Sequence, residues 1–358
     1  MNTKRLNVIL EKLDAMGVPQ MLITDPMSIF YLTGRFVNPG ERLFALYISK
    51  SGRNKIFIND LFTVPEDLGV EKVWFSDMDD SISLLHDAID HQAPLGIDKV
   101  MAARFLLPLM EKNSAAKFLN TSICVDEARA VKDGEEIRLM RESSIINDQA
   151  MALVKELIKD GVTEREISDK IGAIYKKLGS DEFSFAPLVG FGANCARGHY
   201  EAGDVAIKPG DCVLVDMGCK KGGYCSDMTR TFFFKTVKGR HRFLYEKVLE
   251  AVRTAEAMVK PGVPLCDIDQ AARKVLTDAG CEGIFTTRLG HFIGLEDHDY
   301  GDVSRNNKSV AVAGNIFSIE PGVYIMGEVG IRIEDLVLVT EDGCEILNSY
   351  TKELQVVG

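Results

Sequence analysis

Four carboxylates occupy matching places in two segments that are typical of β-hairpins: Asp216, Asp227, Glu320 and Glu334. The segments are DCVLVDMGCKKGGYCSDMTRTFFF and NIFSIEPGVYIMGEVGIRIEDLVLV, and each is a run of strand-forming residues around a glycine-containing turn. Cross-strand partners have Cβ atoms only about 4.5–5.5 Å apart. Like charges at that distance destabilise a sheet unless a cation neutralises them. The spacing therefore indicates a metal site.

The register of the first hairpin depends on where its chain turns. A turn centred on Lys221 and Gly222 makes Asp216 and Asp227 direct cross-strand partners. The bland alternative is a pair of acids that face the solvent. Asp216 ends the apolar run CVLVD, so we expect a buried pair.

The second hairpin is expected to have the same arrangement. A turn centred on Gly327 makes Glu320 and Glu334 direct partners, and Glu320 follows the apolar residues IFSI. The two hairpins thus predict two opposed carboxylate pairs at equivalent positions.

Each hairpin follows one copy of an internal repeat. IKDGVTEREISDKIGAIYKKLG, beginning at Ile158, aligns without gaps on VKPGVPLCDIDQAARKVLTDAG, which begins at Val259. A helical copy followed by a hairpin, found twice, predicts a domain with internal pseudo-twofold symmetry.

Histidine completes a possible ligand set. In LGHFIGLEDHD, His291 follows a glycine and precedes an apolar run, whereas His86, His91 and His241 lie among polar residues and are expected on exposed helices. Imidazole together with carboxylates suits manganese, cobalt or zinc. We therefore expect His291 to join the four acids.

The motifs VDMG…CSDMTRTF, GHFIGL…H, SIEPGVY and IRIEDLVLV resemble those of the pita-bread metallopeptidases: methionine aminopeptidase, aminopeptidase P and prolidase. DPMSIFYLTG and DEARAVKDGEEIRLMR resemble the amino-terminal domain and linker of the prolidase and aminopeptidase P branch. The resemblance implies an α/β (α+β) fold, with a small creatinase/prolidase-type α/β domain before a duplicated pita-bread catalytic domain. A capping box at Asp133 and Glu136 begins a new helix, and we set the domains at 1–128 and 129–358.

The resemblance also implies roles for the five ligands. Asp216 would bind one metal ion, His291 and Glu320 the other, and Asp227 and Glu334 would bridge both. Two divalent ions, manganese first with cobalt or zinc as alternatives, lower the pKa of a shared water toward ~7, which yields a bridging hydroxide. Glu320 would also shuttle the proton to the leaving nitrogen.

Three further residues match the family pattern. His298 would polarise the scissile carbonyl, His199 would line the proline side of the cleft, and Arg332 would orient the bridging acids. The implied substrate is a short peptide with an Xaa-Pro bond. The alternative role for Arg332 is an ordinary ion pair.

Several positions depart from the family pattern. Phe292 stands where many relatives have glycine, Asp297 where they have an apolar residue, and Thr287 where aminopeptidase P enzymes often have histidine. Arg305 does not match the position of the carboxylate-binding cation of prolidases, which falls near Asp302. Xaa-Pro dipeptidase and aminopeptidase P therefore both stay open.

The composition of the chain limits the binding partners and locations to be expected. The 358 residues carry a net charge of −11 without a basic run, which argues against nucleic acid. No apolar stretch suits a signal peptide or a membrane span, so we expect a cytoplasmic protein with no membrane partner. The eight cysteines form no CxxC pair, which argues against a zinc knuckle. The family resemblance implies a homodimer.

Three other functions are alternatives to an Xaa-Pro peptidase. The first is a non-peptidase metal-dependent hydrolase or lyase on the same fold, and the second is a non-catalytic pita-bread binding protein. A dinucleotide enzyme is the third, and it rests only on VGFGANCARG, which lacks the third glycine of the fingerprint.

Overall fold

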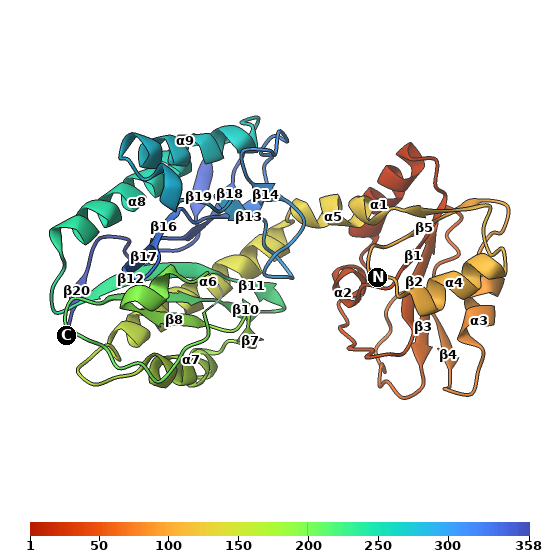
Figure 1. Cartoon of the computed structure of the whole chain (residues 1–358). Coiled ribbons are helices and arrows are strands. Elements are labelled where there is room, and N and C mark those ends of the chain that lie inside the picture. Colours follow the sequence, from red (N-terminus) through yellow and green to blue (C-terminus); the bar gives the residue numbers. More distant parts are fainter. Residues whose placement is uncertain (199) are drawn as a thin grey trace. The chain divides into compact units, whose positions relative to one another are not determined.

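The computed structural model describes residues 1–198 and 200–358, and it divides the chain into two compact units, Met1–Arg129 and Ala130–Gly358 (Figure 1). Each unit combines helices with β-sheet around its own core. The mixed α/β fold class expected from the sequence is therefore confirmed. Within the described residues, no helix is long and apolar enough to cross a membrane.

The first unit is built on one six-stranded sheet in the order β4-β3-β2-β1-β5-β6. Strands β1, β2 and β3 are antiparallel neighbours, and the outer pairs are parallel. The strands are β1 Gln20–Ile23, β2 Phe44–Ser49, β3 Lys55–Asn59, β4 Glu71–Phe75, β5 Pro94–Ile97 and β6 Lys117–Asn120. The helices are α1 Thr3–Ala15, α2 Pro26–Thr33, α3 Ser81–Ala88, α4 Ala103–Glu111 and α5 Ser122–Ala130, the last crossing into the second unit.

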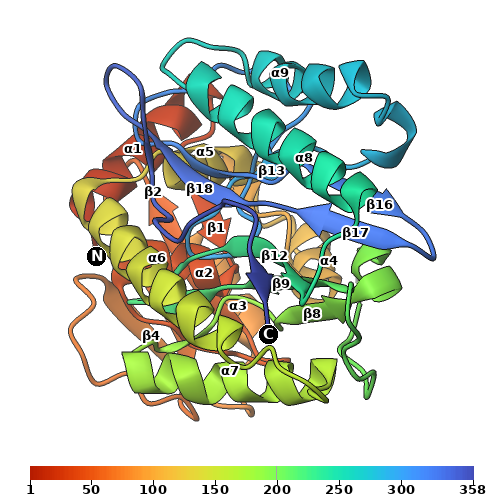
Figure 2. The same cartoon turned by 90° about the vertical axis from the view of Figure 1, so that its left-hand side faces the viewer.

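Four helices cover the outside of the second unit. They are α6 Gly134–Lys155, α7 Glu164–Leu178, α8 Gly239–Met258 and α9 Leu265–Asp278. Figure 2 shows α6 and α7 on one side of the strands of this unit, with α8 and α9 on the other. The expected capping box begins α6, where the Asp133 carboxylate accepts from the Glu136 N–H and the Glu136 side chain accepts from the Asp133 N–H.

The strands between these helices form several small sheets. Two sheets carry most of the site, one in the order β20-β12-β9-β8 and one in the order β15-β18-β19. The strands are β7 Glu182–Phe183, β8 Leu188–Phe191, β9 Cys212–Met217, β10 Cys219–Lys221, β11 Tyr224–Cys225, β12 Met228–Phe234, β13 Gly290–His291, β14 Asp302–Val303, β15 Ile316–Ile319, β16 Gly322–Ile325, β17 Val329–Arg332, β18 Asp335–Val339, β19 Cys344–Ile346 and β20 Val356–Val357. Two short 3-10 helices, Gly192–Ala196 and Glu282–Ile284, complete the unit.

The internal repeat appears in the backbone as well as in the sequence. Gly161 and Gly262, which precede α7 and α9, have φ angles of 80° and 85°. Gly179 and Gly280, which follow the same helices, have φ angles of 85° and 76°. This left-handed region favours glycine because it lacks a Cβ atom. The two copies therefore turn in the same way at both ends, as a duplicated domain requires.

Candidate metal centre

His291 lies at the centre of the site on β13 and is almost fully buried. Its Nδ1 lies 3.2 Å from the carbonyl oxygen of Phe292, which can only accept, so Nδ1 carries a proton and Nε2 is the nitrogen that could bind a metal. Nε2 is 3.6 Å from Asp227 Oδ2 and 3.5 Å from Glu320 Oε1. An imidazole with one nitrogen held by a carbonyl and the other facing carboxylates has the geometry of a metal ligand.

The turn of the first hairpin lies one residue later in the chain than the predicted turn at Lys221 and Gly222. Gly222 and Gly223 form the turn, with φ angles of 57° and 85°. A two-residue hairpin turn of this kind needs positive φ at both central positions, and adjacent glycines meet that need without strain. Asp216 therefore pairs with Thr229, and the predicted direct pairing with Asp227 is wrong.

The two acids of this hairpin still share one face of the sheet. Asp227 lies two residues before Thr229, and alternate residues of a strand point to the same side. Asp227 is thus diagonal to Asp216 instead of opposite to it. The side chain of Asp227 is 6% exposed and that of Asp216 is 16% exposed, so the expectation of buried acids largely holds.

The second hairpin has the predicted register. Gly322 pairs with Arg332, and both are five residues from Gly327. The adjoining ladder between β15 and β18 keeps the same register. Glu320 and Glu334 therefore stand opposite each other in the short gap between the two ladders, which confirms the prediction for this pair.

The carboxylates gather more negative charge than nearby protein groups neutralise. Burial, with the Glu334 and Asp216 carboxylates adding to it, raises the pKa of Asp227 well above its ordinary value. Burial and the Glu320 and Asp216 carboxylates act on the pKa of Glu334 in the same direction. Two like charges about 4 Å apart repel by about 4 kcal/mol even at an effective dielectric constant near 20. The cluster therefore favours a bound cation.

Oxygen atoms with no protein partner support this interpretation. Among the described residues, Asp216 Oδ1, Asp227 Oδ1 and Glu334 Oε1 are buried without a hydrogen bond. Buried carboxylate oxygens are normally paired or bind a metal. Ligand atoms of Asp227, His291 and Glu334 also lie within 4.8 Å of one another. Carboxylate oxygens together with one imidazole nitrogen suit divalent manganese, cobalt or zinc.

Arg332 connects the two hairpins through Thr229. Arg332 Nη2 donates to Asp216 Oδ2 at 2.5 Å, and its Nε donates to Thr229 Oγ1 at 2.9 Å. The Thr229 hydroxyl in turn donates to Glu334 Oε2 at 2.7 Å. Arg332 thus touches Asp216 directly and reaches Glu334 through Thr229. The sequence reasoning missed Thr229, although it lies only two residues after Asp227.

A second group of possible ligands overlaps the first. His291, Asp297 and His298 also have ligand atoms within 4.8 Å of one another, and the two imidazole rings stack with centroids 3.9 Å apart. Arg288 Nη2, however, lies 2.9 Å from His298 Nδ1. Arginine has only donors, so Nδ1 must accept, and the proton of a neutral His298 ring is then on Nε2.

This tautomer decides between the two groups. A protonated Nε2 cannot bind a metal, and it lies 3.5 Å from Asp297 Oδ2, where it can donate a hydrogen bond. His298 is therefore arranged as a hydrogen-bond donor. Asp297 adds a further acid beside the cluster, and burial, with Asp216 and Glu320 adding to it, raises the pKa of Asp297 to about 6.

The remaining predicted positions have mixed outcomes. His199 lies outside the described residues. Arg305 is exposed, as expected of an ordinary loop arginine. His241 was expected on an exposed face, but it is 3% exposed on α8, with Nε2 3.4 Å from Glu328 Oε1. All eight cysteines are free, and six are buried.

Phe292 shows how one departure from the family pattern is accommodated. Its ring packs on Phe317 with centroids 5.5 Å apart. It also lies over Gly301, where a Cβ atom would approach the ring to 2.8 Å. The large side chain therefore packs against Phe317 and over the space that Gly301 leaves open.

Comparisons with known proteins agree with this geometry. The family model described as Metallopeptidase family M24 matches residues 138–341, and that described as Creatinase/Prolidase N-terminal domain matches residues 5–131. An uncharacterized peptidase of Staphylococcus aureus is 34% identical over 353 residues, which cover 97% of this chain and 99% of that protein.

Solved structures with the same fold include two dipeptidases. A dipeptidase from Pyrococcus horikoshii has a TM-score of 0.92 and 30% identity, with 99% of this chain and 100% of that chain covered. An Xaa-Pro dipeptidase from Bacillus anthracis has a TM-score of 0.91 and 27% identity, with 99% of each chain covered. Matches of this extent, on a chain whose acids and imidazole converge on one buried point, show that it belongs to metallopeptidase family M24 and is a metallopeptidase.

Proposed function

We propose that this metallopeptidase uses two divalent ions to hydrolyse Xaa-Pro bonds at the amino terminus of dipeptides or short peptides. The observation that carries the proposal is the convergence of Asp227, Glu320 and Glu334 on His291, with buried carboxylate oxygens left unpaired. A non-catalytic scaffold would gain nothing from so many uncompensated buried acids, which destabilise the fold in the absence of a cation.

Five residues would hold the ions. Asp227 and Glu334 would bridge them, Asp216 would bind one, and His291 and Glu320 would bind the other. When bound, the two ions supply Lewis acidity at the scissile carbonyl and lower the pKa of a water molecule between them. Manganese is our first choice, with cobalt or zinc as alternatives, because the ligands are mostly oxygen with one imidazole.

Residues beside the ligands would move protons and orient the substrate. The Glu320 side chain is 22% exposed, more than that of Asp227, so it can meet water and substrate and pass a proton to the leaving nitrogen. The Nε2–H of His298 would donate to the scissile carbonyl oxygen as negative charge develops there. Arg332 would keep Asp216 and, through Thr229, Glu334 in place.

Substrate, assembly and location complete the proposal. The similarity to a dipeptidase and an Xaa-Pro dipeptidase supports a short proline-containing peptide as substrate. For His199 we keep the role implied by the family resemblance, on the proline side of the cleft. We also propose a cytoplasmic homodimer, whose assembly size-exclusion chromatography with light scattering will test.

An assay with two peptides tests this function. Purified protein with Mn²⁺ or Co²⁺ is given an Xaa-Pro dipeptide and an Xaa-Pro tripeptide, with Glu320→Ala as the inactive control. Cleavage of the dipeptide alone identifies a dipeptidase, and cleavage of the tripeptide identifies an aminopeptidase P. If metal stimulates cleavage of neither peptide, the proline-peptidase proposal is wrong.

A further inference from the structure

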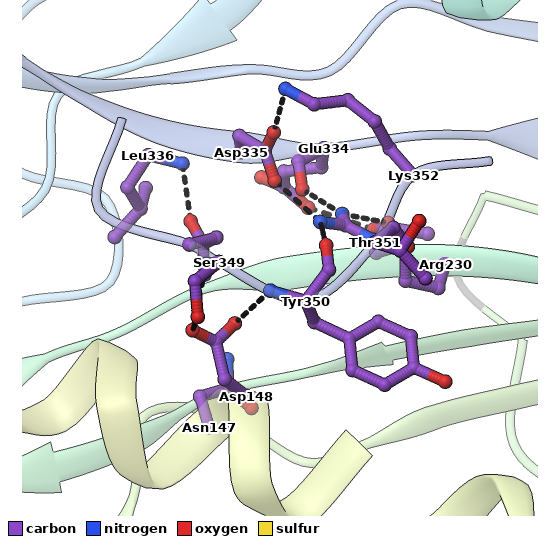
Figure 3. Close-up of polar contacts among 12 residues, drawn as sticks. Asn147, Asp148, Arg230, Glu334, Asp335, Leu336, Ser349, Tyr350, Thr351 and Lys352 are labelled. Atoms are coloured by element: carbon purple, nitrogen blue, oxygen red, sulfur yellow. Dashed lines mark hydrogen bonds and ion pairs between the residues drawn. The ribbon is translucent and has the colours of Figure 1, made fainter. Parts of the chain in front are cut away.

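The carboxy-terminal segment Asn348–Lys352 runs behind the two acids proposed to bridge the metals. Figure 3 shows Arg230 between Glu334 and this segment, with Lys352 reaching Asp335. We call residues 348–352 the carboxy-terminal clamp. None of the roles proposed for the metal ligands involves it, and its Asn348 bonds to the main chain of Asp227.

Asn348 holds Asp227 and the strand that follows Glu334. Its Nδ2 donates to the carbonyl oxygen of Asp227 at 3.2 Å. Its Oδ1 accepts from the N–H of Leu336 at 2.6 Å. The side chain is 5% exposed, so both bonds are shielded from water. The Asn348 amide therefore joins the two hairpins. It bonds to the carbonyl oxygen of Asp227 and to the N–H of Leu336, which lies two residues after Glu334.

Arg230 holds Glu334 and binds it to the clamp. Its Nη1 donates to the carbonyl oxygen of Glu334 at 2.6 Å, and its Nη2 donates to the carbonyl oxygen of Tyr350 at 2.6 Å. Its Nε donates to the carbonyl oxygen of Thr351 at 3.1 Å. Arg230 is 1% exposed, and its planar group fixes the direction of each bond.

The two cations of this buried arrangement are paired with acids. Arg230 Nη2 lies 2.7 Å from Asp335 Oδ1, and Lys352 Nζ donates to Asp335 Oδ2 and, at 2.5 Å, to Glu256 Oε1. Two cations thus face two anions.

The clamp also bonds to helix α6. Asp148 of α6 accepts from the N–H and hydroxyl of Ser349 at 2.7 and 2.6 Å (Figure 3). The clamp is therefore anchored to both halves of the duplicated unit.

We propose that the clamp is a positioning device for the bridging acids, with Asn348 as its key residue. This inference rests on the proposed two-metal function. Asn348 of the clamp bonds to the carbonyl group of Asp227, and Arg230, which the clamp holds through Tyr350 and Thr351, bonds to that of Glu334. The carboxylates of both acids each keep a buried oxygen without a protein partner. Bonds to the main-chain carbonyl groups of Asp227 and Glu334 fix the positions of both carboxylates. They leave the unpaired carboxylate oxygens available to the ions. Groups that orient metal ligands typically contribute about 10–100-fold in metal affinity.

A second buried asparagine provides a matched control. Asn315 Nδ2 donates to the carbonyl oxygen of Ala130 at 2.9 Å, and its Oδ1 accepts from the N–H of Val312 at 2.9 Å. It is 3% exposed and touches none of the proposed ligands through these bonds. Asn348→Leu and Asn315→Leu thus each remove one bond to a carbonyl and one from an N–H. Asn348→Ala and Asn315→Ala repeat the comparison if leucine prevents folding.

The test is a Mn²⁺ titration of each metal-free, full-length variant by calorimetry, with the melting temperature as a measure of folding. We expect Asn348 variants to bind Mn²⁺ about 10–100-fold more weakly than wild type, and Asn315 variants to bind within about twofold of it. If the Asn348 and Asn315 variants bind Mn²⁺ with equal affinity, whether unchanged or weakened, the clamp only stabilises the fold. A wild-type protein that binds none of Mn²⁺, Co²⁺ and Zn²⁺ would refute the proposed function itself, and the clamp with it.

Discussion

Thr229 Oγ1 lies 2.7 Å from Glu334 Oε2 and joins the first hairpin of the catalytic unit to the second. The same hydroxyl accepts from Arg332 Nε, so its proton is committed to the carboxylate. A hydroxyl has one proton and can donate to only one acceptor. This bond therefore fixes the rotation of the Glu334 carboxylate, a proposed bridging ligand.

Replacing this hydroxyl tests the connection. Thr229→Val keeps the shape but leaves Arg332 and Glu334 without their shared partner, which should cost about 1–3 kcal/mol of stability and about 10–100-fold in Mn²⁺ affinity. Thr231→Val is the matched control, because Thr231 Oγ1 is buried on the same strand and donates to the carbonyl oxygen of Arg332 at 2.9 Å. Calorimetry should find weaker Mn²⁺ binding in the first variant only. Unchanged binding in Thr229→Val would show that the hydroxyl does not orient Glu334.

A second prediction concerns Arg288 and the tautomer of His298. Because Arg288 donates to Nδ1, the neutral ring should carry its proton on Nε2. Two-dimensional ¹⁵N NMR of labelled histidine should show this tautomer in wild type and a mixture in Arg288→Met, with kcat lowered at least several-fold. Arg305→Met removes an exposed arginine and should change neither reading. An Nδ1–H tautomer in wild type would contradict the assigned role of His298.

The raised pKa of Asp297 predicts how the metal-free protein responds to pH. Below its ordinary pKa of 3.8, the carboxyl is protonated in both the folded and the unfolded state. As the pH rises from there to about 6, the unfolded chain ionises first, so the free energy of unfolding falls. The loss amounts to about 3 kcal/mol at most, at about 1.4 kcal/mol per pH unit.

Asp297→Asn should remove that loss. Urea unfolding in EDTA should find the variant more stable than wild type at pH 7 and nearly equal to it below pH 4. If the free energies of unfolding of wild type and variant differ by the same amount at both pH values, the difference arises from packing and not from ionisation of Asp297.

Lys132 and Asp299 form a buried ion pair near the His298 loop, with Nζ and Oδ2 3.6 Å apart and side chains 1% and 4% exposed. Lys132→Met leaves a buried carboxylate without this cation and should cost about 3–5 kcal/mol in the free energy of unfolding. The double variant Lys132→Met/Asp299→Asn should recover part of that loss. Denaturant titration compares the two, and a double variant less stable than Lys132→Met would contradict the ion-pair account.

The repeat and the second hairpin were predicted from local signals in the sequence, and the fold class was predicted from the family resemblance. The single glycine of the second turn sets a symmetric register, which the structure reproduces at Glu320 and Glu334. The first turn contains two adjacent glycines, Gly222 and Gly223, and the predicted turn at Lys221–Gly222 placed Asp227 opposite Asp216. In the structure, Thr229, two residues later, is the partner of Asp216. The carboxylates still gathered on one face, since a shift of two keeps strand parity.

Contacts between distant segments were beyond sequence reasoning. Thr229 and Glu334 are 105 residues apart, and Asn348 lies 121 residues from Asp227. No periodicity or spacing relates such residues until both hairpins are folded. His241 was misjudged for a similar reason, because polar neighbours along its helix hid the burial that packing imposes.

The most direct test of the two-metal account is a titration of metal-free enzyme with Mn²⁺ while hydrolysis of an Xaa-Pro dipeptide is followed. With five ligands and two bridging acids, the rate should rise to a plateau at two equivalents of Mn²⁺ per chain. A plateau at one equivalent would contradict it.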